Sequence, residues 1–307
     1  MAANLPGSQE GAVSFRCASL PRKSARDGRP LNAMTVDVED YFHVQAFADV
    51  IDRKDWDGLP TRVESNTSRM LDLFAEKGAT ATFFVLGWVA ERFPALVRRI
   101  ADAGHEIGSH SYAHQRIFTQ TPDEFREDVR RAKCVIEDAA GNAVRGYRAP
   151  TFSLNADTWW AYDVLGEEGY VYSSSIYPVA RDNYGMPDAP RTPFMPTKSE
   201  TMVEIPMSTV RYGQRNLPAS GGGFFRLLPY GVSRHALKRV NRAEGSSIFY
   251  CHPWEIDPGQ PRVSGATLKS RMRHYTNLGA MERRISRLLD DFAWGRMDEV
   301  FLGNAGR

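Results

Sequence analysis

Short apolar runs alternate with amphipathic segments along this chain from Leu31 onward. Such runs are typical of strands buried on both faces, and the segments between them have helical periodicity. This alternation predicts an α/β fold whose parallel sheet closes, or nearly closes, into a barrel, with a functional site at the carboxyl ends of the strands. Strands are expected at residues 32–39, 79–86, 105–110, 143–149, 170–174, 202–209 and 246–252, and helices at residues 65–77, 88–103, 121–140, 155–168, 228–243 and 276–294.

The length of 307 residues allows one large α/β domain or two small ones. Residues 1–28 are polar and rich in Pro, Gly, Ser and Arg, which predicts a disordered N-terminal segment, and residues 29–307 are expected to form a single domain. The N-terminal segment lacks the apolar core of a secretory signal, and no apolar run is long enough to span a membrane. The expected compartment is therefore the cytoplasm.

The formal net charge of +2 gives no electrostatic reason to expect a nucleic acid or an anionic membrane as a partner. Cys17, Cys134 and Cys251 are too far apart for a zinc finger or a disulfide framework. A Pro-rich stretch at residues 175–200 interrupts the alternation, and a loop of this length is usually functional or disordered.

Three acids end the first predicted strand. Asp37, Glu39 and Asp40 follow an apolar run, and alternate residues of a strand share a face, so Asp37 and Glu39 are expected to point the same way. Carboxylates this close repel one another, and a bound cation or a shared proton would relieve the repulsion. The alternative is an ordinary solvated strand end.

Two histidines follow the third predicted strand. His110 and His114 are four residues apart, so one helical turn would put both imidazoles on one side. Such a pair is a good clamp for a divalent metal, although two loop histidines would give the same pattern.

Arg148 ends the fourth strand and can pair with a carboxylate of the acidic cluster, or it is a plain surface arginine. His252 ends the last strand, where Glu255 or Asp257 can orient it, or it is structural.

Taken in order, Asp37-Val-Glu39-Asp40, His110-Ser-Tyr-Ala-His114, Arg148-Ala-Pro150 and Tyr250-Cys-His252 resemble the motifs of the polysaccharide deacetylase family, carbohydrate esterase family four, whose domain is the NodB-homology domain. The resemblance covers roughly residues 31–260. It implies a distorted (β/α)7 barrel and metal-dependent removal of an N-acetyl group from an amino sugar. It also implies that Asp37 is the general base, Arg148 holds that base, and His252 is the general acid. The resemblance makes His110 and His114 metal ligands.

This sequence departs from the commonest form of the first motif, in which two aspartates are adjacent, because position 38 is Val. The acidic metal ligand is therefore Glu39 or Asp40, and strand alternation favours Glu39. Two histidines with one carboxylate suit a catalytic zinc ion, or another divalent metal of similar preference. The strings DVEDYFHVQAF, GGGFFRLLPY and FYCHPWEIDP resemble a branch associated with bacterial exopolysaccharide biosynthesis, which carries a C-terminal extension like the one here from about residue 258.

An N-acetylated glycan is the expected partner. Aromatic side chains near the strand ends can stack on sugar rings, or they can be core residues; the main candidates are Tyr41, Phe152 and Trp254. The backbone near Tyr41 is expected to help hold the oxyanion. Other readings are a deformylase or another C–N amidohydrolase of this fold, and a non-catalytic carbohydrate-binding homologue.

Overall fold

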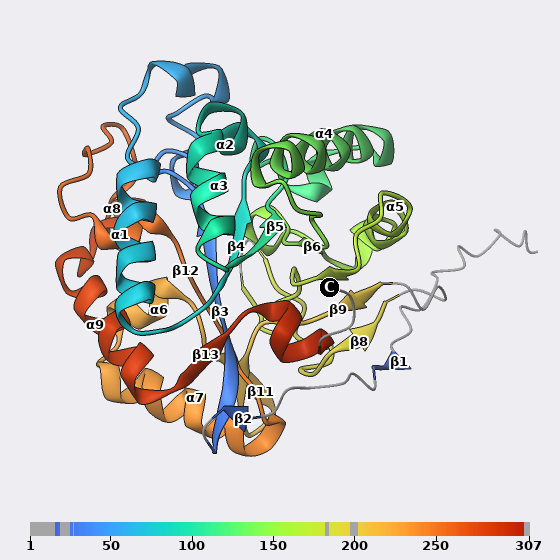
Figure 1. The fold of residues 1–307 in the computed structure, drawn as a ribbon, viewed down its shortest axis with the longest axis vertical. Helices are drawn as coiled ribbons and strands as arrows, with labels where there is room; N and C mark the ends of the chain where they lie inside the picture. The colour runs from blue at the N-terminus through green and yellow to red at the C-terminus, as the bar shows by residue number, and fades with distance from the viewer. Residues whose placement is uncertain (1–15, 19–24, 27, 182–183, 197–201, 304–307) are drawn as a thin grey trace, which may run out of the picture.

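The computed structural model describes residues 16–18, 25–26, 28–181, 184–196 and 202–303. Its central sheet contains a parallel strand for each of the seven predicted ones, in the spatial order β9-β7-β6-β5-β4-β3-β12. Figure 1 shows the long strand β3 crossing the middle of the molecule, with helices arranged around the sheet. The strands are β3 (Arg29–Val38), β4 (Thr82–Val85), β5 (Glu106–Ser109), β6 (Gly146–Tyr147), β7 (Tyr172–Ser173), β9 (Val203–Glu204) and β12 (Ile248–Cys251).

The predicted distorted barrel is confirmed as a curled sheet that stays open between β9 and β12. These two strands end the parallel series, and the described residues form no ladder between them. Instead, the backbone N–H of Ile248 donates to Ser208 Oγ at 2.8 Å, so a side chain bridges the gap at this point. The carboxyl ends of the parallel strands therefore still meet around one opening.

The predicted helices are present, with shifted ends. The helix expected at residues 88–103 is two helices, because Pro94 disfavours helical geometry at Phe93, whose φ and ψ are −128° and 54°. The capping box of Thr121 and Glu124 begins α4, and Gly141 ends it with φ of 69°. The helices are α1 (Val63–Glu76), α2 (Gly87–Arg92), α3 (Pro94–Asp102), α4 (Pro122–Ala140), α5 (Ala161–Glu167), α6 (Gly222–Leu227), α7 (Tyr230–Glu244), α8 (Leu268–Tyr275) and α9 (Leu278–Asp291).

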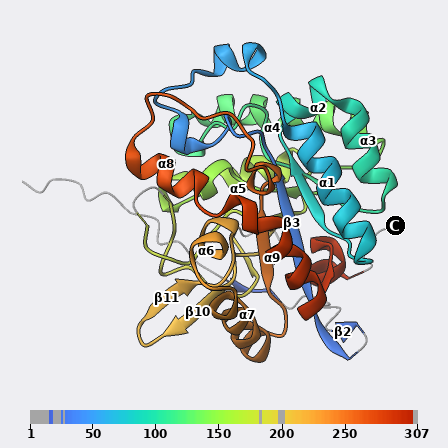
Figure 2. The same ribbon diagram turned by 90° about the vertical axis from the view of Figure 1, so that its left-hand side faces the viewer.

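Several elements were not predicted. The last predicted helix ends at Asp291, and the three residues of β13 (Ala293–Gly295) then pair with β3 in parallel. A two-stranded sheet of β10 (Thr209–Tyr212) and β11 (Arg215–Pro218) lies beside α7 in Figure 2. Short helical turns are η1 (Gln45–Phe47), η2 (Arg53–Gly58), η3 (Ile117–Thr119), η4 (Pro150–Phe152), η5 (Ala156–Thr158), η6 (Pro253–Ile256) and the π-helix η7 (Asp298–Leu302).

Most of the N-terminal segment at residues 1–28, and residues 182–183 and 197–201 of the Pro-rich stretch, lie outside the described residues. The described parts of these regions include three short strands. β1 (Arg16–Cys17) pairs with β8 (Phe194–Met195), and β2 (Ala25–Arg26) pairs with β3. Over the described ranges, every helix is too short or too polar to cross a lipid bilayer.

Candidate active site

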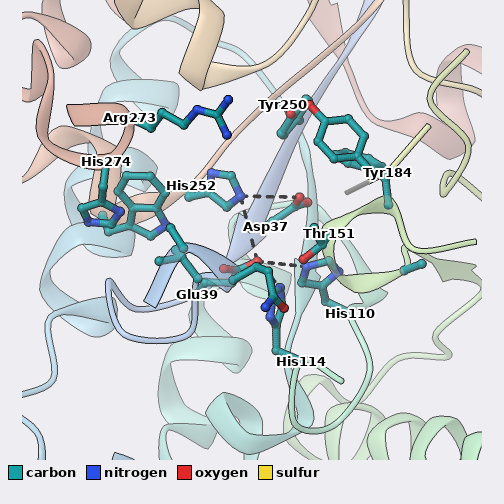
Figure 3. Close-up of a pocket in the computed structure, with 16 residues that line it drawn as sticks. Asp37, Glu39, His110, His114, Thr151, Tyr184, Tyr250, His252, Arg273 and His274 are labelled. Carbon is teal, nitrogen blue, oxygen red and sulfur yellow. Dashed lines mark hydrogen bonds and ion pairs between the residues drawn. The ribbon is translucent and has the colours of Figure 1, made fainter. Parts of the chain in front are cut away.

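Glu39, His110 and His114 form a buried cluster with metal-binding geometry. Nε2 of His110 and Nε2 of His114 lie 3.0 and 3.2 Å from Glu39 Oε1. One ligand atom from each residue lies within 4.8 Å of the other two. Ligands about 2.1 Å from a tetrahedral centre are roughly 3.4 Å apart, so the donor set and its spacing fit a divalent cation such as zinc. Figure 3 shows the three side chains converging from different parts of the chain.

The two histidines are placed by the backbone that follows β5. The backbone N–H of His110 donates to Val85 O, and His110 Nδ1 lies 2.8 Å from Arg148 O. With Nδ1 donating to that carbonyl, the Nε2 lone pair faces Glu39. The expected helical turn between the histidines is wrong: the segment is a loop that folds back on itself, with positive φ at Ser111 (66°) and His114 (50°).

Asp37 and Arg148 form an ion pair beside this cluster. Arg148 Nη1 lies 2.7 Å from Asp37 Oδ1, and both side chains are almost completely buried. The guanidinium also donates to Thr35 Oγ1 at 2.7 Å and to Ser174 O at 3.2 Å, and it lies 4.2 Å from the Phe84 ring centroid. Because Arg148 occupies Oδ1, Oδ2 is the oxygen of Asp37 that remains available for other partners.

His252 lies close to both Asp37 and the metal-binding cluster. Its Nε2 is 3.9 Å from both Asp37 Oδ2 and Glu39 Oε1, and its Nδ1 is 2.8 Å from Glu255 Oε1. Burial acts to lower the pKa of His252, but the Glu255 hydrogen bond and the nearby carboxylates outweigh it and raise the pKa to about 9. His252 is therefore held in the protonated form, with Nε2 directed toward Asp37 and Glu39.

Glu255 is held in turn by Arg226, a residue that the sequence did not single out. Arg226 Nε donates to Glu255 Oε2 at 2.7 Å, and its Nη1 donates to the carbonyls of His274 and Thr276 at 2.8 Å. Close approach to Glu255 also explains a glycine of the GGGFF string: a Cβ on Gly222 would lie 2.1 Å from both Glu255 carboxylate oxygens. This part of the Gly-rich string is the start of α6.

Asp40 and Asp257 point elsewhere. Asp40 accepts hydrogen bonds from the backbone N–H groups of Arg62 and Val63 at 2.5 and 2.8 Å, at the beginning of α1. Asp257 pairs with Arg62 at 3.0 Å, so Glu255 and not Asp257 orients His252. The backbone N–H of Tyr41, which was expected to help hold an oxyanion, instead donates to Asp40 Oδ1 at 2.9 Å.

The clustered residues open into a cavity of about 210 Å³. Phe152 and Trp254 line it, whereas Tyr41 does not and is buried in the hydrophobic core. The Trp254 ring stacks between His252 and His274, with ring centroids 5.1 and 4.2 Å away. The lining also contains Tyr184, Tyr250 of β12, and Arg273 and His274 of α8. The sequence assigned no role to these four side chains, because the elements that carry them meet only in the folded chain.

Comparisons with known proteins agree with this architecture. Residues 55–169 match the family described as polysaccharide deacetylase, and residues 174–302 match a domain of unknown function, DUF3473. The chain is similar to a peptidoglycan-N-acetylglucosamine deacetylase of Bacillus cereus, with 38% identity over 84 residues, which are 27% of this chain and 30% of that protein. It is also similar to a peptidoglycan deacetylase of Helicobacter pylori, with 30% identity over 118 residues, which are 37% of this chain and 38% of that protein.

The matched stretches thus span only about a third of those relatives. Among solved structures, a candidate polysaccharide deacetylase from Mycobacterium smegmatis has the same fold, with a TM-score of 0.59 and 22% identity over 93% of each chain. His110, His114 and Arg148 lie in the polysaccharide deacetylase match, and Arg226, His252 and Glu255 lie in the DUF3473 match. Residues 55–169 therefore match the polysaccharide deacetylase family, the region that follows matches a domain of unknown function, and both matched regions contribute side chains to the cavity, whereas Asp37 and Glu39 precede them.

Proposed function

We propose that this protein is a metal-dependent deacetylase that removes the N-acetyl group from an amino sugar of a poly- or oligosaccharide. The observation that carries the proposal is the convergence of two sets of groups on one cavity. The buried Glu39, His110 and His114 cluster is a three-ligand set for a catalytic metal, most suitably zinc. The Asp37–Arg148 pair and His252 lie directly beside it, as a base and an acid would have to lie.

The chemistry that a cation at this cluster supplies when bound is Lewis acidity toward the acetamide carbonyl and toward water. In our proposal Asp37 Oδ2 accepts the proton of the attacking water. Arg148 donates to Oδ1 of that carboxylate at 2.7 Å and holds the side chain in place. Oδ2 is available for this task because Oδ1 is already bound to Arg148.

His252 supplies the second proton transfer. Its Nε2 faces Asp37 and Glu39, and the raised pKa keeps a proton on the imidazole at neutral pH. That proton passes to the sugar nitrogen as the C–N bond breaks, so acetate and a free amine are the products. Glu255 and Arg226 are positioning residues that hold the imidazole in this orientation.

The substrate assignment is supported by the relatives, whose names describe peptidoglycan deacetylases. The aromatic side chains of Phe152 and Trp254 in the cavity wall suit a sugar ring. A role in bacterial exopolysaccharide biosynthesis is part of the proposal and rests on the resemblance of the sequence strings. A deformylase acting on the same kind of amide, and a protein that binds glycans without turnover, are the competing outcomes.

Acetate release from a panel of N-acetylated oligosaccharides, with metal analysis of the same preparation, tests the proposal. We expect acetate from at least one glycan, loss of activity after chelation, and recovery with zinc. Formate release from an N-formyl sugar without acetate release would favour the deformylase. Glycan binding without release of either acid, by a preparation containing one metal per chain, would contradict catalysis.

A further inference from the structure

The active-site cavity does not end at the metal cluster. Phe152 and Tyr184 line it and also line a second cavity of about 530 Å³. Arg181 belongs to this second cavity and to a third one of about 1030 Å³, which is lined by residues 179–181 and 187–192 and by the β10–β11 hairpin. Shared lining residues thus join the three cavities into one path that leads away from the metal cluster.

Three arginines, which we call the arginine rim, line the first part of this path: Arg273 in the active-site cavity and Arg116 and Arg181 in the second one. In the part of the chain that the structure describes, none of the three forms a salt bridge, although surface arginines of this protein commonly do, for example Arg92 with Asp57. Arg116 lies 4.8 Å from the Phe118 ring and Arg181 lies 4.7 Å from the Phe224 ring. Aromatic faces hold these two guanidinium groups and leave their N–H donors free for a ligand.

Two members of the arginine rim each share a cavity with Tyr184. Arg273 and Tyr184 line the active-site cavity, and Arg181 and Tyr184 line the second one. Burial raises the pKa of Tyr184, and the positive charges of Arg181 and Arg273 act in the opposite direction. Figure 3 shows Arg273 and Tyr184 on either side of Tyr250 at the edge of the active-site cavity. Arg116, Arg181 and Arg273 thus supply positive charge and hydrogen-bond donors to the two cavities that share Tyr184.

The carboxylates of this region do not cancel that charge. Asp157 lines the second cavity beside Arg116 and Arg181. The third cavity is lined by two acids, Asp188 and Glu244, and by four arginines, Arg181, Arg191, Arg211 and Arg215. Glu244 is already paired with Arg191. Another cavity, of about 390 Å³, shares His114 with the active-site cavity and is lined by Asp49, Asp52 and Asp55 with Arg53. The two directions out of the active site thus differ in charge.

We propose that the glycan substrate is acidic, and that the arginine rim binds a carboxylate on a sugar adjacent to the one being deacetylated. This inference rests on the proposed function, because it assigns the neighbouring sugar of the same chain. The planar guanidinium fork matches a carboxylate in geometry and charge, and a neutral sugar would leave these donors to water. A polymer of alternating acidic and N-acetylated sugars would place a carboxylate at the arginine rim each time an acetamide reaches the metal cluster.

Kinetics on two oligosaccharides of equal length test this inference: a neutral N-acetylglucosamine oligomer and an oligomer that alternates N-acetylhexosamine with uronate. We expect a lower KM for the acidic oligomer, and a difference that shrinks as salt is raised. Arg181→Gln and Arg273→Gln should each raise the KM for the acidic oligomer by up to about fivefold relative to the neutral one, the range of an exposed ion pair. Arg181→Lys and Arg273→Lys should recover part of the loss.

Arg271→Gln is the matched control, because Arg271 is exposed on the same helix α8 and lies outside the cavity linings described above. It should leave the KM for both oligomers unchanged. Calorimetry with an oligouronate that carries no acetamide separates this inference from the proposed function, since it needs no turnover. Oligouronate binding that weakens in Arg181→Gln supports the arginine rim even if no acetate is ever released. Equal KM values for both oligomers, with acetate released from both, overturn the acidic substrate and leave the deacetylase intact.

Discussion

At the scale of single residues, the site is dominated by buried charges that have buried partners. Arg148 is completely inaccessible, and a guanidinium in that position is tolerated only with a carboxylate and further acceptors around it. Asp37 supplies the charge, and Thr35 and Ser174 supply the acceptors. The same arrangement leaves Asp37 Oδ2 directed toward His252, which is where the proposed chemistry needs a base.

Asp37→Asn and Glu39→Ala should separate catalysis from metal binding. Asp37→Asn keeps the shape of the side chain but cannot take up the water proton, so turnover should fall on the order of 10²–10⁴ while metal content stays near one per chain. Glu39→Ala removes one of the three clustered ligands, so metal should be lost first. Metal stoichiometry after dialysis and acetate release are the two measurements. Full metal in Glu39→Ala with loss in Asp40→Ala would contradict the assignment of Glu39.

Glu255→Gln should shift the pH dependence of turnover. Glu255 helps to raise the pKa of His252 to about 9. The glutamine side chain keeps a hydrogen-bond acceptor for His252 but removes the negative charge. The pKa of His252 should therefore fall, the protonated acid should be lost at lower pH, and the alkaline limb of the pH–rate profile should move to lower pH. Asp257→Asn is the control, since Asp257 pairs with Arg62. An unchanged limb in Glu255→Gln would remove Glu255 from the proton transfer.

Some of these residues could be found from sequence and others could not. The acids and histidines could be predicted because they cluster at the ends of predicted strands. The prediction that strand alternation places Glu39 beside Asp37 is only partly correct. β3 ends at Val38, and Glu39 follows in a tight turn whose N–H donates to Asp37 O at 3.0 Å. Arg226 was missed because its contact with Glu255 bridges 29 positions and depends on how α6 packs against η6.

At the scale of elements, α6 and η6 fix the acid of the site. Both lie in the DUF3473 region, and the absence of a side chain at Gly222 lets α6 approach the Glu255 carboxylate. Glu255 cannot swing away without breaking its bonds to Arg226 and His252. Glycine at this position is therefore required by a close contact and not by a turn.

Gly222→Ala should impair turnover without loss of metal. The added Cβ would lie 2.1 Å from the Glu255 oxygens, so the carboxylate must move and His252 loses its orientation. Gly223→Ala is the matched control, because a Cβ there meets nothing within 4 Å and the two variants have the same composition. We expect kcat to fall at least about tenfold in Gly222→Ala only, with normal metal content in both. Equal kcat in the two variants would show that the close contact is not needed for catalysis.

At the scale of the whole molecule, the alternation of apolar and amphipathic runs was sufficient to predict the barrel. Each predicted strand has its counterpart, because strands buried on both faces are rich in apolar residues. The return of the chain to the sheet after α9 was not predictable, since β13 has only three residues and continues the apolar pattern of the helix before it. Its place is defined by pairing with β3 and by contacts of the following η7 segment.

Glu106 ties this last segment to the barrel. Its Oε2 accepts hydrogen bonds from Thr82 Oγ1 at 2.5 Å and from the backbone N–H of Asp298 at 3.1 Å. Its Oε1 accepts one from the Tyr172 hydroxyl at 2.9 Å. Burial, with a contribution from the charge of Asp298, raises the pKa of Glu106 from 4.5 to about 7. The protonated form of Glu106 is therefore favoured by the folded protein.

This pKa predicts that Glu106 lowers the stability of the fold as pH rises from about 4.5 to about 7. In that window the unfolded chain has lost the Glu106 proton and the folded protein still holds it. The contribution of Glu106 to the free energy of unfolding therefore falls by at most about 1.4 kcal/mol for each pH unit, and it stays constant above the window. Glu106→Gln removes the ionisable group. Its amide oxygen can accept from Thr82 and Asp298 and its amide nitrogen can donate to the Tyr172 hydroxyl, so its stability relative to the wild type should rise between pH 5 and pH 7.5. Urea unfolding of both proteins across this range measures the difference, and Glu127→Gln, an exposed change on α4, controls for the loss of one charge. A difference between Glu106→Gln and the wild type that does not vary with pH would show that Glu106 does not change its protonation on unfolding.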